Sequence, residues 1–260
     1  MCTASWLTDG PRFHLLFNRD ELLRRSRGVA PELHAREGVA YLSPTDPQSG
    51  GTWFAATERG LLVALLNRNV DGQTSGSTTP GRRSRGSLIP ELVGARTIAE
   101  FNRLLEALDL SECPPFRMFA NLPGEPHSSG AVWNGERLSI QAITTPSGLL
   151  CSSSRGDQRA TEVRSALWSE RAAERAALGA EALRRFHRSH EPERSAVSVC
   201  MHREDAQSVS HLDVTRDATV ITVAYFDGPP CSVAEPSRST LRLRRAGPGN
   251  PNPPDGDTIP

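Results

Sequence analysis

The sequence contains no lysine: all thirty of its basic residues are arginine. Lysine Schiff bases, lysine general bases and the lysine of a phosphate-binding P-loop are therefore excluded. Thirty acidic residues balance the arginines, so the chain lacks the net positive charge with which a dedicated nucleic-acid-binding protein holds phosphates. We expect a small-molecule substrate or ligand and no nucleic-acid partner. Any catalytic nucleophile must be cysteine, serine, threonine, a carboxylate or water.

Long apolar runs are also absent. No segment approaches the roughly 18 apolar residues of a membrane-spanning helix, and the first residues lack the basic and apolar regions of a secretory signal. No two cysteines have the CxxC spacing of a zinc ribbon or redox motif; the five are Cys2, Cys113, Cys151, Cys200 and Cys231. We expect a cytoplasmic protein with free thiols and no transmembrane segment, in an oligomeric state that the sequence leaves open.

Alternating apolar residues predict an N-terminal hairpin, with strands at 2–8 and 12–18 joined by Asp9-Gly10-Pro11. Further strands, predicted in the same antiparallel sheet, are 39–43, 52–57 and 61–66. Two helices are then expected between residues 82 and 110, and a helical pair interrupted at Gly179 is expected up to residue 187. The remaining predicted strands are 117–122, 130–133, 137–143, 196–202, 208–214 and 219–226.

This order of strands and helices predicts an α+β protein with antiparallel sheets in layers, because the regular strand–helix alternation of a parallel sheet is missing. Beyond residue 234 the chain is rich in proline and offers almost nothing apolar to bury. We therefore expect a single domain at residues 1–234 and a disordered tail at 235–260.

The second residue is the strongest candidate for chemistry. Methionine aminopeptidase removes Met1 when the next side chain is small, and this would leave Cys2 with a free α-amine. An α-amino group titrates near roughly 7.7 to 8.0, so nucleophile and general base would belong to one residue. The alternative is that Cys2 merely begins a strand as a small hydrophobic residue.

Polar residues gather where the predicted second strand returns beside Cys2. Arg19 can lower the pKa of the thiol and hold a substrate carbonyl or carboxylate, and Asp20 can orient the α-ammonium group. Asn67 ends another predicted strand and offers an amide donor to a developing oxyanion. The alternatives are a solvated strand end for the charged pair and an ordinary turn asparagine for Asn67.

Several of these segments resemble the NRDE family, which includes the transport-and-Golgi-organisation protein. The resemblance rests on Met1-Cys2-Thr3, FNRDE at 17–21, GGTW at 50–53 and the stretch 60–68, and extends with later segments to residue 231. It implies an N-terminal-nucleophile hydrolase-like fold: an αββα sandwich of two antiparallel sheets covered by helices. It also implies distant similarity to penicillin V acylases, bile-salt hydrolases and acid ceramidase, and thus hydrolysis of a linear N-acyl amide through a Cys2 thioester.

Carried over residue by residue, the resemblance makes Cys2 the nucleophile, Arg19 the arginine of the second strand and Asn67 an oxyanion-side residue. In the acylases the aspartate follows the arginine by three positions, whereas Asp20 follows Arg19 directly, so Asp20 and Glu21 compete to orient the amine. We choose Asp20. A run of serines at 152–154 stands where the acylases have an asparagine donor. The predicted substrate-binding residues are Asn18, Glu21, Trp53 and Ser153.

The resemblance leaves a second interpretation open, because eukaryotic members of the family are linked to haem movement and lipid homeostasis. The chain would then be a non-catalytic haem or lipid binding or trafficking protein, with haem as its ligand. His187, His190, Cys200 and His202 are ligand types that zinc or haem iron can use. Their spacing matches no common zinc signature, so we predict a structural role for them, no metal site and no cofactor.

Overall fold

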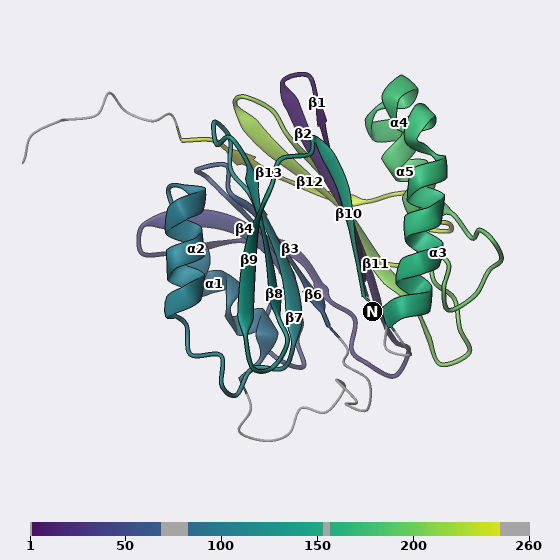
Figure 1. The fold of residues 1–260 in the computed structure, drawn as a ribbon, viewed down its shortest axis with the longest axis horizontal. Helices are drawn as coiled ribbons and strands as arrows, with labels where there is room; N and C mark the ends of the chain where they lie inside the picture. Colours follow the sequence, from purple (N-terminus) through teal and green to yellow (C-terminus); the bar gives the residue numbers. More distant parts are fainter. Residues whose placement is uncertain (1, 69–82, 153–156, 245–260) are drawn as a thin grey trace, which may run out of the picture.

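The computed structural model describes residues 2–68, 83–152 and 157–244, and it consists of two antiparallel sheets packed face to face (Figure 1). The six-stranded sheet contains, in spatial order, β10 (Ser147–Ser152), β1 (Cys2–Asp9), β2 (Arg12–Leu22), β11 (Ala206–Arg216), β12 (Val220–Phe226) and β13 (Ser237–Arg242). The seven-stranded sheet contains β3 (Val29–Arg36), β4 (Val39–Thr45), β5 (Phe54–Thr57), β6 (Leu62–Asn67), β7 (Phe116–Asn121), β8 (Ser128–Trp133) and β9 (Leu138–Ile143).

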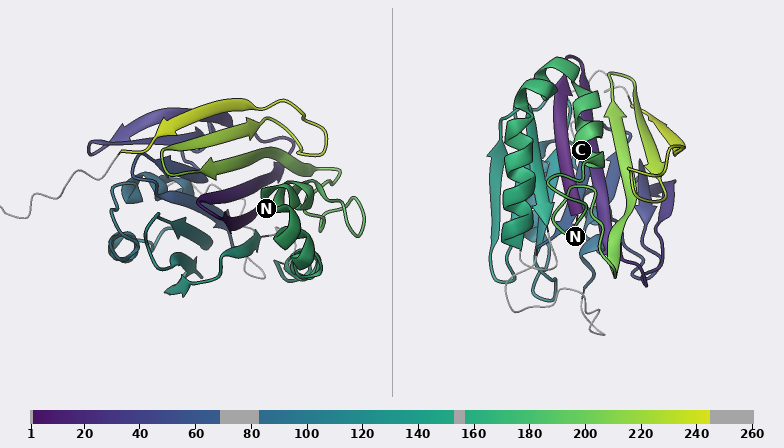
Figure 2. Two further views of the ribbon diagram at one scale, coloured as in Figure 1. Left: turned by 90° about the horizontal axis from the view of Figure 1, so that it is seen from above. Right: turned by 90° about the vertical axis from the view of Figure 1, so that its right-hand side faces the viewer.

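Helices cover the outer face of each sheet, as the views from above and from the side in Figure 2 show. A short 3₁₀ turn (Arg85–Ser87), α1 (Ile89–Leu92) and α2 (Ile98–Ala107) lie on the seven-stranded sheet. On the six-stranded sheet lie α3 (Asp157–Glu170), α4 (Ala172–Leu178) and α5 (Ala180–Arg188). The layers therefore run helix, sheet, sheet, helix, which confirms the predicted α+β αββα sandwich. Among the described residues, none of the helices has the length and apolar character needed to cross a membrane.

Strand alternation divides the core into separate apolar layers. Side chains such as Trp6, Leu15 and Phe17 fill the space between the two sheets, together with Leu62 and Leu66 of β6. Alternate residues of β6, Val63 and Leu65, instead face α1 and α2 in an outer cluster. On β1, Thr3 and Ser5 alternate with apolar residues and therefore lie on the opposite face of the strand. Both are buried on the side of α3 and α5. The first strand thus separates an apolar interior from a polar layer under the helices.

The pairing of β10 with β1 determines what lies beside Cys2. Gly148 pairs with Trp6, and a Cβ atom at position 148 would come within 2.1 Å of the indole ring. Only glycine fits there without displacing Trp6. This register brings Ser152 directly opposite Cys2.

Several predicted elements differ from the structure. The first 70 residues do not form one sheet, because β1 and β2 belong to the six-stranded sheet and β3 to β6 to the other. Residues 196–202 form no strand: their apolar run is buried, but serine hydroxyls such as Ser198 Oγ bond the local backbone instead of a ladder. Strands β3 and β10 went unpredicted. Residues 237–242, expected in the disordered tail, pair with β12 and bury Leu241; residues 245–260 lie outside the described part.

Candidate active site

Cys2 is the first residue of β1, which lies between β10 and β2 in the six-stranded sheet. It pairs with Arg19 of β2 and with Ser152 of β10, and its backbone N–H donates to Ser152 Oγ at 2.9 Å. Its side chain is buried in the apolar layer between the sheets. Burial raises the pKa of the Cys2 thiol, while the N-terminal charge acts in the opposite direction. The thiol is therefore protonated near neutral pH and requires a base before it can act as a nucleophile.

Arg19 projects from the same sheet face as Cys2, since directly paired residues share a face. Its guanidinium lies over the Trp53 ring at 4.6 Å, and Nη2 lies 3.5 Å from Asp46 Oδ2 and 4.0 Å from Glu21 Oε2. Nη1 is buried and has no hydrogen-bond partner among the described residues. A buried donor without an acceptor is costly, so this atom is a natural contact for a ligand oxygen.

Two further side chains hold the Arg19 surroundings in place. Asp46 accepts a hydrogen bond from Arg25 at 2.5 Å. Burial opposes the ionisation of Asp46, but the Arg25 hydrogen bond and the charges of Arg25 and Arg19 keep its pKa below the ordinary value. Glu21 lies on the Arg19 side, 3.6 Å from Arg25, and is partly exposed. Predicted residues Glu21 and Trp53 therefore do lie around Arg19.

Asp20 points to the opposite face of β2, into the polar layer under α3. Ser208 Oγ donates to Asp20 Oδ1 at 2.6 Å, and Arg164 Nη2 lies 3.4 Å from Oδ2. Arg164 is fully buried, and it also donates to Thr3 Oγ1 at 2.6 Å and to the Ser198 carbonyl at 2.8 Å. The charge of Asp20 acts on the Cys2 thiol and raises its pKa. Of the two competing carboxylates, Asp20 is thus the one coupled to Cys2.

Asn18 lies in the same polar layer and has no capacity left for a substrate. Its Nδ2 donates to the carbonyls of His187 and Val199 at 2.9 and 3.0 Å. Its Oδ1 lies 2.9 Å from His187 Nδ1 and 2.7 Å from His211 Nδ1, so both rings are Nδ1–H tautomers. This placement favours a structural role for Asn18 over the predicted substrate contact.

The remaining predicted residues are Asn67 and Ser153. Asn67 is the last residue of β6. Because side chains alternate along a strand, Asn67 lies on the same face as Val63 and Leu65, whose side chains face the outer helices. Its oxyanion role stays a prediction that this alternation does not favour. Ser153 lies outside the described residues, and its neighbour Ser152 is the serine that contacts Cys2.

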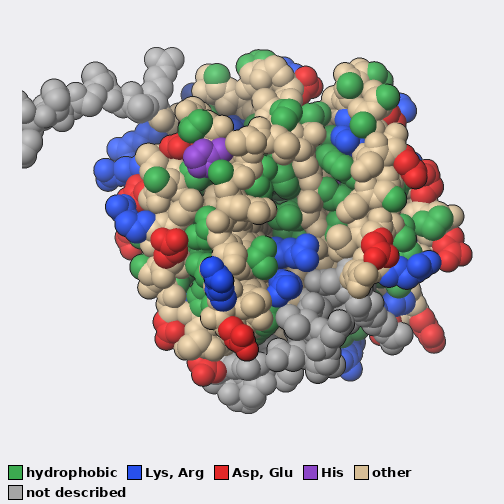
Figure 3. Space-filling model, in the orientation of Figure 1, with side chains coloured by type: hydrophobic (Ala, Val, Ile, Leu, Met, Phe, Trp, Pro, Cys, Tyr) green, Lys and Arg blue, Asp and Glu red, His purple; other side chains and the backbone are tan. Residues whose placement is uncertain are grey.

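Two arginines near Cys2 went unnoticed in the sequence. Arg164 lies on the same face of α3 as the buried residues Ala160 and Leu167. This helical spacing of 160, 164 and 167 could have indicated from the sequence that Arg164 is buried. Arg85 follows no pattern that would single it out among thirty arginines. Burial lowers the pKa of Arg85, and the charges of Cys113, Cys2 and Glu21 act on it, so it lies near the Cys2 thiol. Figure 3 shows basic side chains recessed between the two layers on this face.

The predicted histidine and cysteine group divides in two. His187 is buried under α5, where Ser5 Oγ lies 2.8 Å from its Nε2. Burial lowers the pKa of His187 well below its ordinary value. His190, Cys200 and His202 lie together elsewhere, with Cys231 as a fourth member.

Several solved structures resemble this chain in fold. A Caenorhabditis elegans N-acylethanolamine-hydrolyzing acid amidase ortholog matches with a TM-score of 0.52 and 11% identity, covering 82% of this chain and 92% of that one. Two variants of the Clostridium perfringens conjugated bile acid hydrolase match at 12% identity, with TM-scores of 0.47 and 0.49. They cover 94% and 96% of this chain and 97% and 100% of their own.

The amidase match shows an N-terminal-nucleophile hydrolase-like fold and, at its low identity, the fold alone. No protein of curated function matches the sequence. The sequence model described as Transport and Golgi organisation 2 matches residues 1–128, so the resemblance to that family is confirmed over this part of the chain.

Proposed function

We propose that this protein is a cysteine hydrolase of linear N-acyl amides, and that it becomes active when removal of Met1 frees the α-amine of Cys2. The observation that carries the proposal is the pairing of Cys2 with Arg19, whose buried Nη1 has no hydrogen-bond partner among the described residues. A thiol and an unsatisfied cationic donor then face the same space between the sheets. That combination suits attack on a carbonyl carbon beside a group that holds the acyl portion.

The α-amine is the proposed base. It would take the proton of the Cys2 thiol, and the sulfur would attack the amide carbonyl carbon to give a tetrahedral intermediate. When the intermediate collapses, the C–N bond breaks and the ammonium returns the proton to the leaving amine. Water, deprotonated by the same amine, then attacks the thioester, releases the carboxylic acid and restores the thiol.

Three contacts support this assignment of roles. Ser152 Oγ already accepts a hydrogen bond from the backbone nitrogen that would become the amine. Asp20 is buried nearby with a negative charge that acts on Cys2, so it favours the ammonium that forms during each turnover. Arg19, held over Trp53, is the proposed contact for the substrate carbonyl or carboxylate.

The substrate class rests on chemistry and on fold similarity. The amidase with this fold is named for hydrolysing N-acylethanolamines, which are amides between an acyl group and a small amine. The side chains packed around Cys2 are aliphatic and aromatic, so an acyl group bound beside the thiol would contact an apolar surface.

The test is turnover of a panel of N-acyl amides by protein whose Met1 has been removed. Wild type is expected to release acid and amine, and Cys2→Ala to release neither. Cys113→Ala is the matched control, because Cys113 is also buried and burial raises the pKa of its thiol to about 11. Turnover that survives in Cys2→Ala, or is lost equally in Cys113→Ala, would contradict the proposal.

A further inference from the structure

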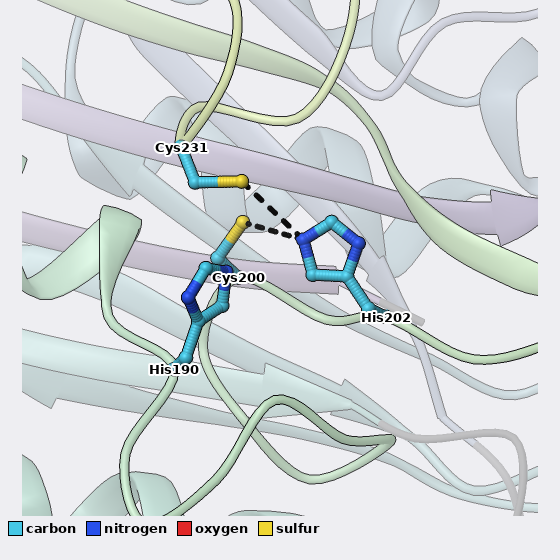
Figure 4. Close-up of side chains that lie close together, drawn as sticks. All are labelled: His190, Cys200, His202 and Cys231. Atoms are coloured by element: carbon cyan, nitrogen blue, oxygen red, sulfur yellow. Dashed lines mark hydrogen bonds between the residues drawn. The ribbon is translucent and has the colours of Figure 1, made fainter.

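Four side chains of types that can bind a metal ion come together at one place. His190 lies two residues beyond α5, Cys200 and His202 lie in the segment before β11, and Cys231 lies in the turn after β12. One potential ligand atom from each lies within 4.8 Å of the other three (Figure 4). The residues span 42 positions of the sequence, so only the fold brings them together.

Two of the separations match the edges of a tetrahedral site. His202 Nε2 lies 3.5 Å from Cys200 Sγ and 3.4 Å from Cys231 Sγ. A tetrahedral zinc ion with bonds of about 2.3 Å to sulfur and about 2.0 Å to nitrogen has S···N edges of about 3.5 Å. These three ligand atoms are therefore close to the separations that the ion requires, and the His190 atom lies within 4.8 Å of each of them.

His190 supplies a second, independent observation. Its Nε2 atom is buried and has no hydrogen-bond partner among the described residues. Its ring stands edge-on to that of His202, with centroids 5.1 Å apart. A buried imidazole nitrogen without a partner is expensive, and coordination of a cation would satisfy it.

We propose that His190, Cys200, His202 and Cys231 form a zinc site. Two imidazole nitrogens and two thiolates are the donor set that selects zinc in tetrahedral geometry. Both thiols release their protons to solvent when the ion binds, so the two thiolates neutralise the charge of Zn²⁺. Four protein ligands complete the coordination, which makes the site structural and leaves no position for a substrate.

One contact must change when zinc binds. In the structure Arg194 Nη2 donates to His202 Nδ1 at 3.1 Å. A neutral imidazole that binds zinc through Nε2 carries its proton on Nδ1 and cannot accept from a guanidinium. The Arg194 side chain is exposed, so it can turn into solvent. Arg194→Ala is therefore a control that should not weaken zinc binding.

The site would fix the irregular segment 189–205 against the sheet. This segment contributes the Val199 carbonyl that Asn18 binds and the Ser198 carbonyl that Arg164 binds. Cys200 is also anchored through its backbone N–H to the Ser189 carbonyl at 2.9 Å. Zinc would thus hold together the end of α5, this segment and the turn at Cys231, and support the polar layer behind Cys2.

The test uses full-length protein, reduced, freed of metal and titrated with zinc chloride, with metal content and native mass as readouts. We expect one zinc ion per chain and a native mass that shows the loss of two protons when the ion binds. We also expect the melting temperature to rise. Cys231→Ala should weaken binding by more than about 100-fold, beyond what loss of an outer-shell partner costs. Cys231 is exposed, so this variant should fold.

The controls Arg194→Ala and Cys113→Ala should bind zinc as wild type does. Cobalt provides a second readout, because thiolate-to-cobalt charge-transfer bands should appear in wild type and weaken in Cys231→Ala. Absence of stoichiometric zinc in reduced wild type would overturn the proposal, and so would equal affinity in Cys231→Ala. A Cys200–Cys231 disulfide in the isolated protein, with no zinc uptake after reduction, would also overturn it. None of these outcomes depends on amide hydrolysis.

Discussion

Cys2 lies directly opposite Arg19 in the ladder between β1 and β2, so the two side chains project from the same face into the space between the sheets. Asp20, the next residue, necessarily points to the other face, where Arg164 and Ser208 hold it. Two consecutive residues of one strand thus serve two different layers. Arg19 lies on the side of the thiol, and Asp20 supports the strand from behind.

The placement of Arg19 predicts that its shape matters as well as its charge. Arg19→Lys keeps a cation but loses the planar group that lies over Trp53 and reaches toward Asp46. We expect kcat/KM for the hydrolysed amide to fall on the order of 10- to 100-fold, because the substrate oxygen is misplaced. Steady-state kinetics would measure this. Trp53→Phe keeps an aromatic face and should lose less; equal rates for Arg19→Lys and wild type would count against the assigned contact.

The buried Arg164–Asp20 pair predicts a large loss of stability when one partner is removed. Both side chains are completely buried, so Arg164→Leu leaves the Asp20 carboxylate with its Ser208 bond and without the guanidinium. We expect the free energy of unfolding to fall by about 3–5 kcal/mol in urea denaturation. Arg159→Leu, an exposed change on the same helix, should stay within about 0.5 kcal/mol of wild type. Similar losses for the two variants would refute the special role of Arg164.

The buried histidines predict acid sensitivity. Burial lowers the pKa of His211 to about 4 and lowers that of His187 as well, so both stay neutral in the folded protein. The unfolded chain takes up protons near pH 6.5, so stability is lost as the pH falls from there toward 4. His211 alone would contribute a loss of roughly 3 kcal/mol across that range.

Urea unfolding measured at several pH values between about 7 and 4 checks this prediction. The slope should be shallower in His211→Asn, whose amide can still donate to Asn18 Oδ1 but does not titrate. Identical slopes for this variant and wild type would mean that His211 is not the group responsible.

The proposed base predicts how the rate of hydrolysis depends on pH. Since burial raises the pKa of the Cys2 thiol, the α-amine has to be neutral to accept its proton. We expect kcat/KM to rise with pH up to about pH 8 and to level off above about pH 9, where the amine has lost its proton. A pH–rate profile on a cleaved N-acyl amide would show this. A profile that falls over the same range would exclude the amine as base.

The sequence was sufficient to predict the fold class and the hairpin that carries the candidate site. Cys2 and Arg19 could be paired because a short turn between two alternating strands fixes their register. The assignment of strands to sheets could not be predicted, because β2 and β3 are separated by only six residues yet belong to different sheets. The pattern of apolar residues within each strand does not indicate that the chain passes from one sheet to the other between them.

Contacts between distant segments were also beyond the sequence. The register of β10, which selects Ser152 over Ser153, depends on the fit of Gly148 against Trp6. Asn18 was predicted to bind substrate, but α5 and residue 199 approach it from far along the chain and use all its hydrogen-bonding groups. Cys231 could not be grouped with His190, because nothing local relates the turn after β12 to the end of α5.

The proposed function requires that processing turns Cys2 into an activated N-terminal nucleophile. The most direct measurement is the intact mass of purified protein before and after brief labelling with stoichiometric iodoacetamide at neutral pH, followed by peptide mapping. We expect Met1 to be absent and Cys2 to be labelled faster than Cys113 and Cys151, which are also buried. Retention of Met1, or a Cys2 no more reactive than those two thiols, would contradict it.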